Sequence, residues 1–150
     1  MVIVQAEKFN TGAEIERITK DRTDIGAVVS FTGLVRDFND GAAVQSLTLE
    51  HYPGMTEREL EKIELSARAK WDLQDCLIIH RFGKMALAEP IVLVVTASKH
   101  RHDAFEAAAF LMDWLKTKAP FWKLEADNEG NADWVKERAS DQDALKRWKD

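Results

Sequence analysis

The sequence predicts an α+β fold with a mixed or largely antiparallel sheet. Strand-like and helix-like segments alternate irregularly along its 150 residues, without an internal repeat. The turn sequence DFNDG, Asp37–Gly41, separates two strand-like segments and indicates one antiparallel hairpin. Apolar residues recur with helical spacing over Asp103–Lys118 and indicate one long helix. The length suits one domain over residues 1–150, with enough residues for a hydrophobic core.

The first part of the chain is predicted to form three strands and a short helix. Val2–Gln5 is an apolar run that indicates a strand, and Ala13–Thr19 places apolar residues among charged ones, as in a surface helix. Gly26–Arg36 is rich in β-branched residues, which favours a buried strand. Val44–Tyr52 alternates apolar and polar residues, so we expect it to return antiparallel to Gly26–Arg36.

A second helix is predicted after Pro53 and Gly54, which end the preceding strand. Thr56 is the expected N-cap, because Glu59 stands three positions later, at the spacing of a capping box. One face of this helix is apolar and consists of Leu60, Ile63, Ala67 and Trp71.

Two apolar strands follow, Cys76–Arg81 and Ile91–Ala97, joined by a loop that carries Lys84. After the long helix, Phe121–Ala126 is predicted to form another strand, and Asp127–Asn131 a loop. The second half of the chain therefore adds three strands to the predicted sheet.

The long helix has the clearest sequence signals. Asp103 is its expected N-cap, and Glu106 occupies the capping-box position. Its apolar stripe consists of Phe105, Ala108, Leu111, Met112 and Leu115. Pro120 prevents the helix from continuing. From Trp134 onward the chain is polar, and we expect that segment to be partly helical.

The composition argues against several classes of function. With a formal net charge of −5, the chain lacks the basic surface that nonspecific nucleic-acid binding requires. Cys76 is the only cysteine, which excludes an internal disulfide and argues against a cysteine-based metal site. No apolar run approaches the ~20 residues that span a bilayer, and no secretory leader is recognisable, so we expect a cytoplasmic protein. P-loop, dinucleotide-binding, serine-hydrolase and zinc-protease motifs are absent.

Three cationic spots stand out in this acidic chain, and the first surrounds Pro120. Lys116 and Lys118 close the long helix, where lysines favour the negative end of the helix dipole, and this explanation suffices for Lys118. Lys123 follows the break, and the turn at Pro120 allows it to approach Lys116. Two neighbouring ammonium groups repel each other unless an anion lies between them. The pair is therefore a candidate anion site or, through a lowered pKa, a candidate general base.

The second spot is KHRH, Lys99–His102, directly before the expected N-cap. Free N–H groups at a helix N-terminus, together with Arg101 and a histidine, can hold a phosphate or a carboxylate. A solvated loop is the alternative explanation. His100 and His102 could in principle bind a metal, but no third ligand is evident.

The third spot is Arg36 at a strand end, where arginines are commonly just exposed.

Several motifs of the chain resemble those of one family, the large, catalytic subunit of molybdopterin synthase. They are FTGLVRDFNDG, LTLEHYPGMTE, SKHRHDAFEAAAFLMDWLKTKAPFWKLE and DWVKERASDQ, and they cover most of the chain from Phe31 onward. Two stretches within them, LEHYPGM and LKTKAPFWK, are not generic patterns, so the resemblance is specific.

The resemblance implies an enzyme that installs two sulfur atoms in cyclic pyranopterin monophosphate and so makes the dithiolene of molybdopterin. The sulfur would arrive as a thiocarboxylate on the C-terminal Gly-Gly tail of a small ubiquitin-like partner subunit. The resemblance further implies an α/β-hammerhead-type fold with an added small subdomain. Large subunits would form a homodimer within a heterotetramer, and no metal or organic cofactor would be needed.

The site residues that the resemblance implies include all three cationic spots. Lys116 would be the principal catalytic residue, and Lys123 would hold the partner's carboxylate or the substrate phosphate. Arg36 would bind substrate in its own subunit, whereas His100 and Arg101 would reach the site of the dimer mate. The full set of implied catalytic and substrate-binding residues is Leu34, Val35, Arg36, His100, Arg101, Lys116, Lys123, Leu124 and Glu125.

Two of these positions carry more specific expectations. Leu34 stands where lysine is common in the family, so only its backbone would contact substrate. Glu125 shares a predicted strand face with Lys123 and would hold that lysine charged. The sequence also leaves two other functions open: a docking module for a ubiquitin-like tail that performs no chemistry, and a stand-alone protein that binds small anions.

Overall fold

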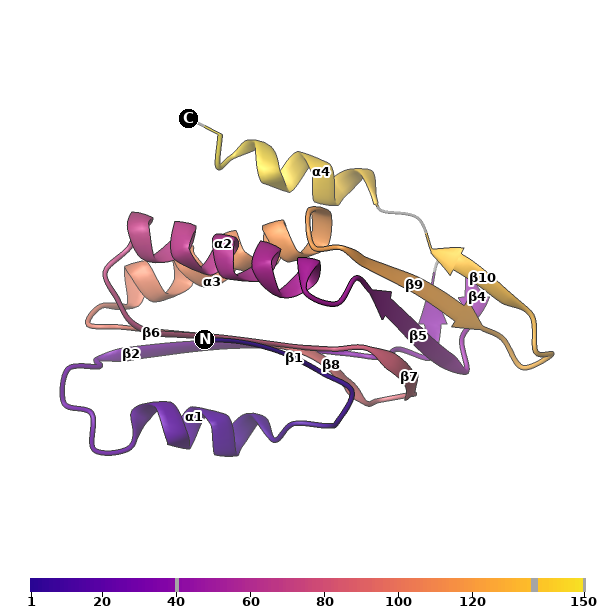
Figure 1. Ribbon diagram of the computed structural model, residues 1–150, viewed down its shortest axis with the longest axis horizontal. Helices are drawn as coiled ribbons and strands as arrows, with labels where there is room; N and C mark the ends of the chain where they lie inside the picture. The colour runs from indigo at the N-terminus through magenta and orange to yellow at the C-terminus, as the bar shows by residue number, and fades with distance from the viewer. Residues whose placement is uncertain (40, 136–137, 150) are drawn as a thin grey trace.

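The computed structural model describes residues 1–39, 41–135 and 138–149, and it has the α+β architecture that the sequence predicts (Figure 1). Its elements are β1 (Val2–Gln5), α1 (Thr11–Thr19), β2 (Ala27–Leu34), β3 (Phe38–Asn39), β4 (Ala42–Ala43), β5 (Ser46–His51), α2 (Met55–Lys70), β6 (Leu73–Arg81), β7 (Gly83–Ala86), β8 (Pro90–Ser98), α3 (Arg101–Thr117), β9 (Phe121–Ala126), β10 (Ala132–Val135) and α4 (Ala139–Lys146).

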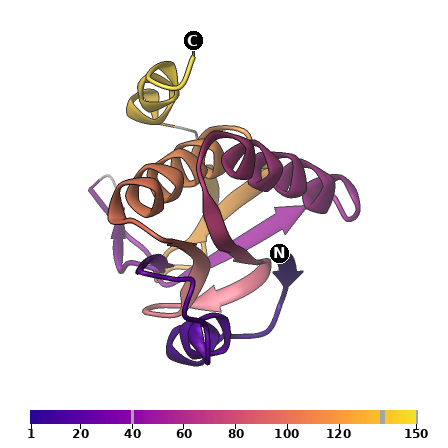
Figure 2. The ribbon, with the colours of Figure 1, turned by 90° about the vertical axis from the view of Figure 1, so that its left-hand side faces the viewer.

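The first sheet has the strand order β1–β6–β8–β2 and is mixed. β1 pairs with β6 in parallel, whereas the other two pairs are antiparallel. Helices α2 and α3 cover one face of this sheet and α1 covers the other (Figures 1 and 2). The central strands β6 and β8 therefore carry apolar residues on both faces, one set packed under α2 and α3 and the other against α1.

The second sheet has the order β10–β9–β5–β7 and lies beyond the C-terminal end of α3 (Figure 1). All of its strand pairs are antiparallel. Leu47 and Leu49 of β5 and Met85 of β7 form a small core with Val35, the residue that follows β2. Short segments connect the two sheets after β2, through Val35, and after β6, through Phe82, and residues 87–89 lead back from β7 to β8.

The predicted hairpin from the Gly26–Arg36 strand into the next strand is wrong. Among the described strands β2 pairs with β8 alone, and β5 pairs with β7 and β9 in the other sheet. The register of β2 shifts between Gly33 and Leu34, and Val35 then exchanges hydrogen bonds with the loop before β8. This irregularity turns the chain out of the first sheet. The DFNDG segment closes only the short β3–β4 pair, and its Asp40 lies outside the described residues.

The start of α2 also differs from the prediction. Its N-cap is Gly54 and not Thr56, and the Glu57 carboxylate accepts a 2.6 Å hydrogen bond from the Gly54 N–H. Gly54 has a φ of +80°, which glycine adopts without strain. Thr56 is buried, and its hydroxyl donates to the Tyr52 carbonyl instead. Only the glutamate half of a capping box is thus present, two residues earlier than predicted, because glycine has no side chain that could accept from the helix.

Two smaller differences concern the ends of the second sheet. Lys84 lies on β7 and not in a loop, because this segment pairs with β5. Trp134 lies on β10, and the predicted helical part of the C-terminal segment is α4. None of the described helices is long and apolar enough to cross a membrane.

Gly26 has no room for a side chain where β2 begins. A Cβ atom there would lie 2.3 Å from the backbone carbonyl oxygen of Lys99. We expect Gly26→Ala to lower the free energy of unfolding by about 1–3 kcal/mol, because the backbone segments must move apart. Chemical denaturation measures this change.

Gly12→Ala is the matched control, since the nearest atom to its added Cβ would be the Asn10 side-chain oxygen at 3.4 Å. Alanine also favours the helix α1, so the free energy of unfolding should stay constant or rise. A Gly26→Ala protein as stable as wild type would show that the approach of β2 to the end of β8 is looser than described.

Candidate functional site

The junction of α3 and β9 brings two lysines together. Lys116 lies exposed in the last turn of α3, which ends at Thr117, before Pro120. β9 begins at Phe121, and Lys123 lies partly buried between the neighbouring strands β5 and β10. The charge of Lys116 contributes to lowering the pKa of Lys123, so the two ammonium groups are near each other, as the turn predicts.

The pKa of Lys123 is lowered first by burial and then by the charge of Lys116. Arg138 acts in the same direction, whereas Asp141 and Glu125 oppose the shift. Within the described chain, the side chain of neither Lys116 nor Lys123 has a hydrogen bond or a salt bridge. A bound anion would pair with both ammonium groups and relieve their repulsion.

Asn39, at the end of β3, joins charged side chains from three other segments. Its side-chain oxygen accepts hydrogen bonds from Arg36 at 3.4 Å and from Arg138 at 2.8 Å. Its side-chain amide donates to the Glu125 carboxylate at 2.8 Å. Because Glu125 lies two residues from Lys123 on β9, the two side chains share one face of the strand. Asn39 therefore links both arginines to the lysine pair.

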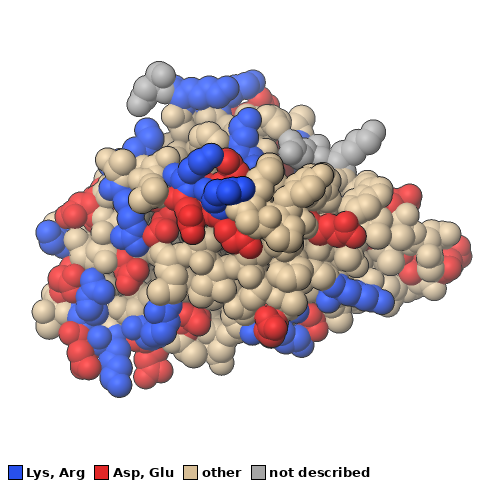
Figure 3. All heavy atoms as spheres, viewed as in Figure 1, with Lys and Arg blue, Asp and Glu red and all other residues tan. Residues whose placement is uncertain are grey.

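Four cationic side chains thus gather at this junction, namely those of Arg36, Lys116, Lys123 and Arg138. The chain as a whole carries a net charge of −5, and Figure 3 shows basic and acidic side chains interspersed on the face in view. The positive charge is therefore a local feature. Such a cluster suits a phosphate or a carboxylate, which both arginines and lysines recognise through charge-assisted hydrogen bonds.

Glu125 has a different partner from the one the sequence predicts. Its carboxylate is hydrogen-bonded to Asn39, and its charge only opposes the lowering of the Lys123 pKa without cancelling it. In the described chain no salt bridge joins the Glu125 carboxylate to Lys123, so Glu125 acts on the lysine only through its charge.

Aromatic rings form one wall beside the lysine pair. His80 of β6 stacks on Phe121, with ring centroids 3.7 Å apart and planes inclined by 16°. His51 of β5 lies 4.4 Å from Phe82 and 6.0 Å from Phe121, between centroids. Burial, followed by the charges of the two lysines, lowers the pKa of His80 to about 4. His80 is therefore uncharged near neutral pH and adds no further cation to the cluster.

His100 and Arg101 lie at the opposite end of α3 from the lysine pair. His100 is the N-cap and Arg101 the first residue of the helix, whereas the predicted N-cap, Asp103, accepts a hydrogen bond from the Asp72 N–H. Both His100 and Arg101 are exposed. An α-helix rises by about 1.5 Å per residue, which places Arg101 about 22 Å from Lys116 along the axis. Within one chain, the structure does not bring these residues to the lysine site.

The other predicted substrate-binding residues, Leu34, Val35 and Leu124, differ in whether their side chains are buried or exposed. Val35 is only 5% exposed in the core of the second sheet, and its N–H and carbonyl are hydrogen-bonded to the loop before β8. Leu124 alternates with Lys123 along β9 and faces the other side of the sheet. The side chains of Val35 and Leu124 therefore lie away from Lys123, and a contact of either residue with substrate stays a prediction. Leu34, by contrast, is exposed where β2 ends, next to Arg36.

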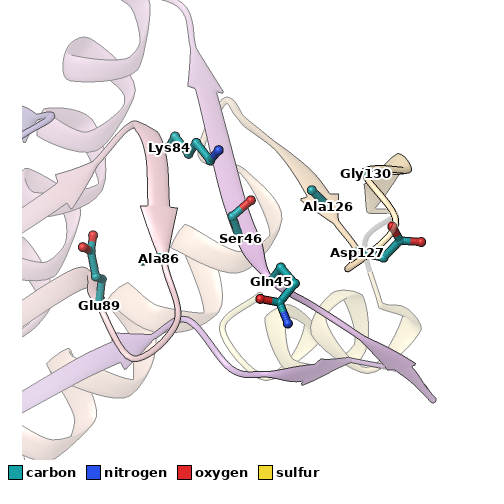
Figure 4. A pocket seen from close by; sticks show the side chains of 8 residues that line it. All are labelled: Gln45, Ser46, Lys84, Ala86, Glu89, Ala126, Asp127 and Gly130. Carbon is teal, nitrogen blue, oxygen red and sulfur yellow. The ribbon is translucent and has the colours of Figure 1, made fainter.

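A hollow of about 560 Å³ lies beside the second sheet (Figure 4). The strand register places its residues Ser46, Ala86 and Ala126 on the face opposite to that of Lys123. The hollow is lined by Gln45, Ser46, Lys84, Ala86, Glu89, Ala126, Asp127 and Gly130. None of the predicted site residues lines it, and Glu89 already pairs with Lys8 and Arg81. The candidate site is therefore the lysine junction. In the described part of the chain, no three His, Cys, Asp or Glu side chains could hold a metal ion.

Sequence reasoning missed three members of this site: Asn39, Arg138 and Asp141. Arg138 stands in DWVKERASDQ, one of the motifs that carry the family resemblance, but no spacing rule connects it with Asn39 or with Lys123. The connection arises because β10 pairs with β9, with Val135 opposite Lys123, and the charges of Arg138 and Asp141 act on that lysine.

Comparisons with known proteins agree with this architecture along the whole chain. The family model described as MoaE protein matches residues 4–118. Relatives named molybdopterin synthase catalytic subunit, from Cereibacter sphaeroides and Escherichia coli K12, are each 50% identical over 147 residues, which is 98% of this chain and 99% and 97% of those proteins.

Two solved structures have the same fold. The MoaE protein from Burkholderia ambifaria has a TM-score of 0.83 at 42% identity, with 99% of this chain and 97% of that chain covered. Molybdopterin synthase from Staphylococcus aureus has a TM-score of 0.80 at 31% identity, with 89% and 96% covered. These matches confirm the resemblance seen in the motifs, and the chain belongs to the MoaE protein family.

Proposed function

We propose that this chain transfers sulfur from the C-terminal thiocarboxylate of a small ubiquitin-like partner to cyclic pyranopterin monophosphate, giving the dithiolene of molybdopterin. The observation that carries the proposal is the gathering of Arg36, Lys116, Lys123 and Arg138 at one junction. The name of the relatives that are 50% identical, molybdopterin synthase catalytic subunit, supports the same reaction and implies a further subunit.

The cluster answers the main physical difficulty of this reaction. The thiocarboxylate of the partner and the phosphate of the precursor are both anions, and they repel each other on approach. In the proposed step the thiocarboxylate sulfur forms a bond to a side-chain carbon of the precursor as a carbon–oxygen bond at that carbon breaks. Water then hydrolyses the resulting thioester, so that the sulfur stays on the precursor as a thiolate and the partner's tail is released as a carboxylate. Cations that are already in place neutralise the approaching charges and stabilise the charge that develops in the transition state.

The positions of the cations suggest a division of roles. Lys116 is exposed at the helix end, where an incoming tail can reach it, and we assign it the principal catalytic role. Lys123 lies deeper and holds the partner's carboxylate or the phosphate, and its lowered pKa also suits it to release a proton. Arg36 and Arg138, which share Asn39 as an acceptor, bind the remaining anionic oxygens.

The proposal includes a homodimer, within a heterotetramer, in which each subunit serves the other's site. The edge of β2 supports this assembly. β2 has eight residues, and among the described strands its outer edge is unpaired. It contains no charge or proline to protect that edge, and Phe31 and Leu34 are 40% and 52% exposed. The other edge strands, β1, β7 and β10, have four residues each.

Antiparallel pairing of two β2 strands about a two-fold axis would also complete the site. The first residue of β2 lies opposite Ser98, next to His100 and Arg101, while its last residue leads to Arg36. In such a pair, the start of each strand lies beside the end of its copy. His100 and Arg101 of one subunit would then approach Arg36 of the other, and the distance along α3 within one chain would no longer separate them.

Lys116→Ala should lower the single-turnover rate of product formation by about a hundredfold or more, because a preorganised charge at the reacting group is lost. Thermal melting should stay unchanged or rise slightly, since the exposed side chain of Lys116 has no hydrogen bond in the described chain and its repulsion of Lys123 is lost. Partner binding should stay unchanged. Lys118→Ala is the matched control, an exposed lysine two residues away that should react as wild type does. A rate near wild type for Lys116→Ala would remove its assigned role.

Mixing Arg101→Ala protein with Lys116→Ala protein should restore part of the activity through subunit exchange. Each mixed dimer would then contain one site with both residues intact, because Arg101 and Lys116 of that site come from different chains. The measurement is product formation as a function of mixing ratio, with exchange followed by mass spectrometry of the intact dimers. Full exchange without recovered activity would place both residues of a site on one chain.

A further inference from the structure

His80 is a buried histidine beside the lysine pair that the proposed reaction does not yet use. It is 8% exposed and lies near the end of β6, on the face of the first sheet that α2 and α3 cover. Its ring stacks on Phe121 at 3.7 Å. Phe121 and Lys123 are two residues apart on β9 and share a strand face, so the His80 ring lies beside the start of β9, the strand that carries Lys123.

The hydrogen bonding of His80 determines which ring nitrogen carries the proton. Its Nδ1 lies 3.0 Å from the Arg81 carbonyl oxygen. A carbonyl oxygen only accepts, so Nδ1 must be the donor. Burial keeps the ring neutral, with a pKa lowered to about 4, and Nε2 therefore has a free lone pair. In the described chain, no donor lies within hydrogen-bonding distance of Nε2.

The charged and titratable groups that act on this ring are few. Lys123 from β9 has the strongest charge effect, followed by Lys116 from α3 and His51 from β5. His51 Nδ1 already lies 3.3 Å from the Thr56 hydroxyl. The two lysines are thus the cationic donors whose charges act on the ring. Lys123 has the stronger effect, and it lies on the same strand and the same strand face as Phe121, on which the ring stacks.

We infer that His80 is a positioning residue whose Nε2 accepts a hydrogen bond from the Lys123 ammonium when the site is loaded with its anions. This inference rests on the proposed function. A neutral acceptor is suited to this place, because it can orient an N–H group without cancelling the positive charge that the anions require. A carboxylate at the same position would neutralise the charge of Lys123. A phenyl ring offers no acceptor and would leave the N–H groups of the Lys123 ammonium unoriented.

The test compares His80→Phe, which keeps a stacking ring but removes the acceptor, with His80→Gln, which retains an acceptor oxygen. His51→Phe is the matched control in the same aromatic cluster. We expect His80→Phe to lower the single-turnover rate by about tenfold or more, as for one lost charge-assisted hydrogen bond. The alkaline limb of its pH–rate profile should move to lower pH, because the Lys123 ammonium loses a stabilising acceptor. His80→Gln should recover part of both effects, and His51→Phe should show neither.

A His80→Phe rate and alkaline limb equal to those of wild type would overturn the inference. If His80→Phe does not fold, nitrogen-15 spectra of the histidine rings in the wild-type chain decide the question. Titration with cyclic pyranopterin monophosphate should leave Nδ1 protonated and shift the Nε2 resonance, and an Nε2 resonance that does not respond would reject the role. Absence of product from the wild-type protein would instead count against the proposed function, so the two failures are distinguishable.

Discussion

Repulsion among cations that are held partly out of water is the constraint on which this site depends. Lys123 is partly buried, and the charges of Lys116 and Arg138 act on it in the same direction as burial. Asp141 and Glu125 offset this effect only in part, and Glu125 is engaged by Asn39. An arrangement of this kind is unfavourable in the empty protein and becomes favourable once an anion binds. Repulsion among the cations thus raises the free energy of the empty site, and the relief of this repulsion favours the state in which anions are bound.

The fold supports this arrangement by fixing its two halves separately. Phe110, Leu111 and Leu115 anchor α3 on the first sheet, which determines where Lys116 emerges. β9 is fixed in the second sheet between β5 and β10, which determines the place of Lys123. Because the sheets are joined through Val35 and Phe82, the helix end and the strand start cannot move apart freely. The repulsion is therefore resisted by two hydrophobic cores and not by a local ion pair.

Features that depend on a few neighbouring residues could be predicted from the sequence. The strands around Val2–Gln5 and Phe121–Ala126 and the approach of Lys116 to Lys123 across Pro120 follow from short-range periodicity and turn chemistry. The sheet to which β5 belongs could not be predicted in this way, because its alternating pattern fits any antiparallel partner. The contact between Arg138 and Asn39 spans 99 residues, so only the pairing of β10 with β9 brings it about.

The His100–Arg101 pair shows a different limit of the sequence. Its composition correctly marks a cationic helix start, but the structure places it far along α3 from the other cations, and only an assembly of two chains would reunite them. The unpaired outer edge of β2, with its exposed Phe31 and Leu34, could not be predicted from short-range sequence patterns, because it depends on the order of the strands in the sheet.

The proposed sulfur transfer is best tested by a reconstitution with defined components. The purified chain is mixed with a small ubiquitin-like partner that ends in a Gly-Gly thiocarboxylate and with cyclic pyranopterin monophosphate, and the pterin products are identified by mass spectrometry. We expect a dithiolene product that contains sulfur from the partner, and no such product when the partner ends in an ordinary carboxylate. Binding of both partner and precursor without any transfer of sulfur would contradict the proposed function.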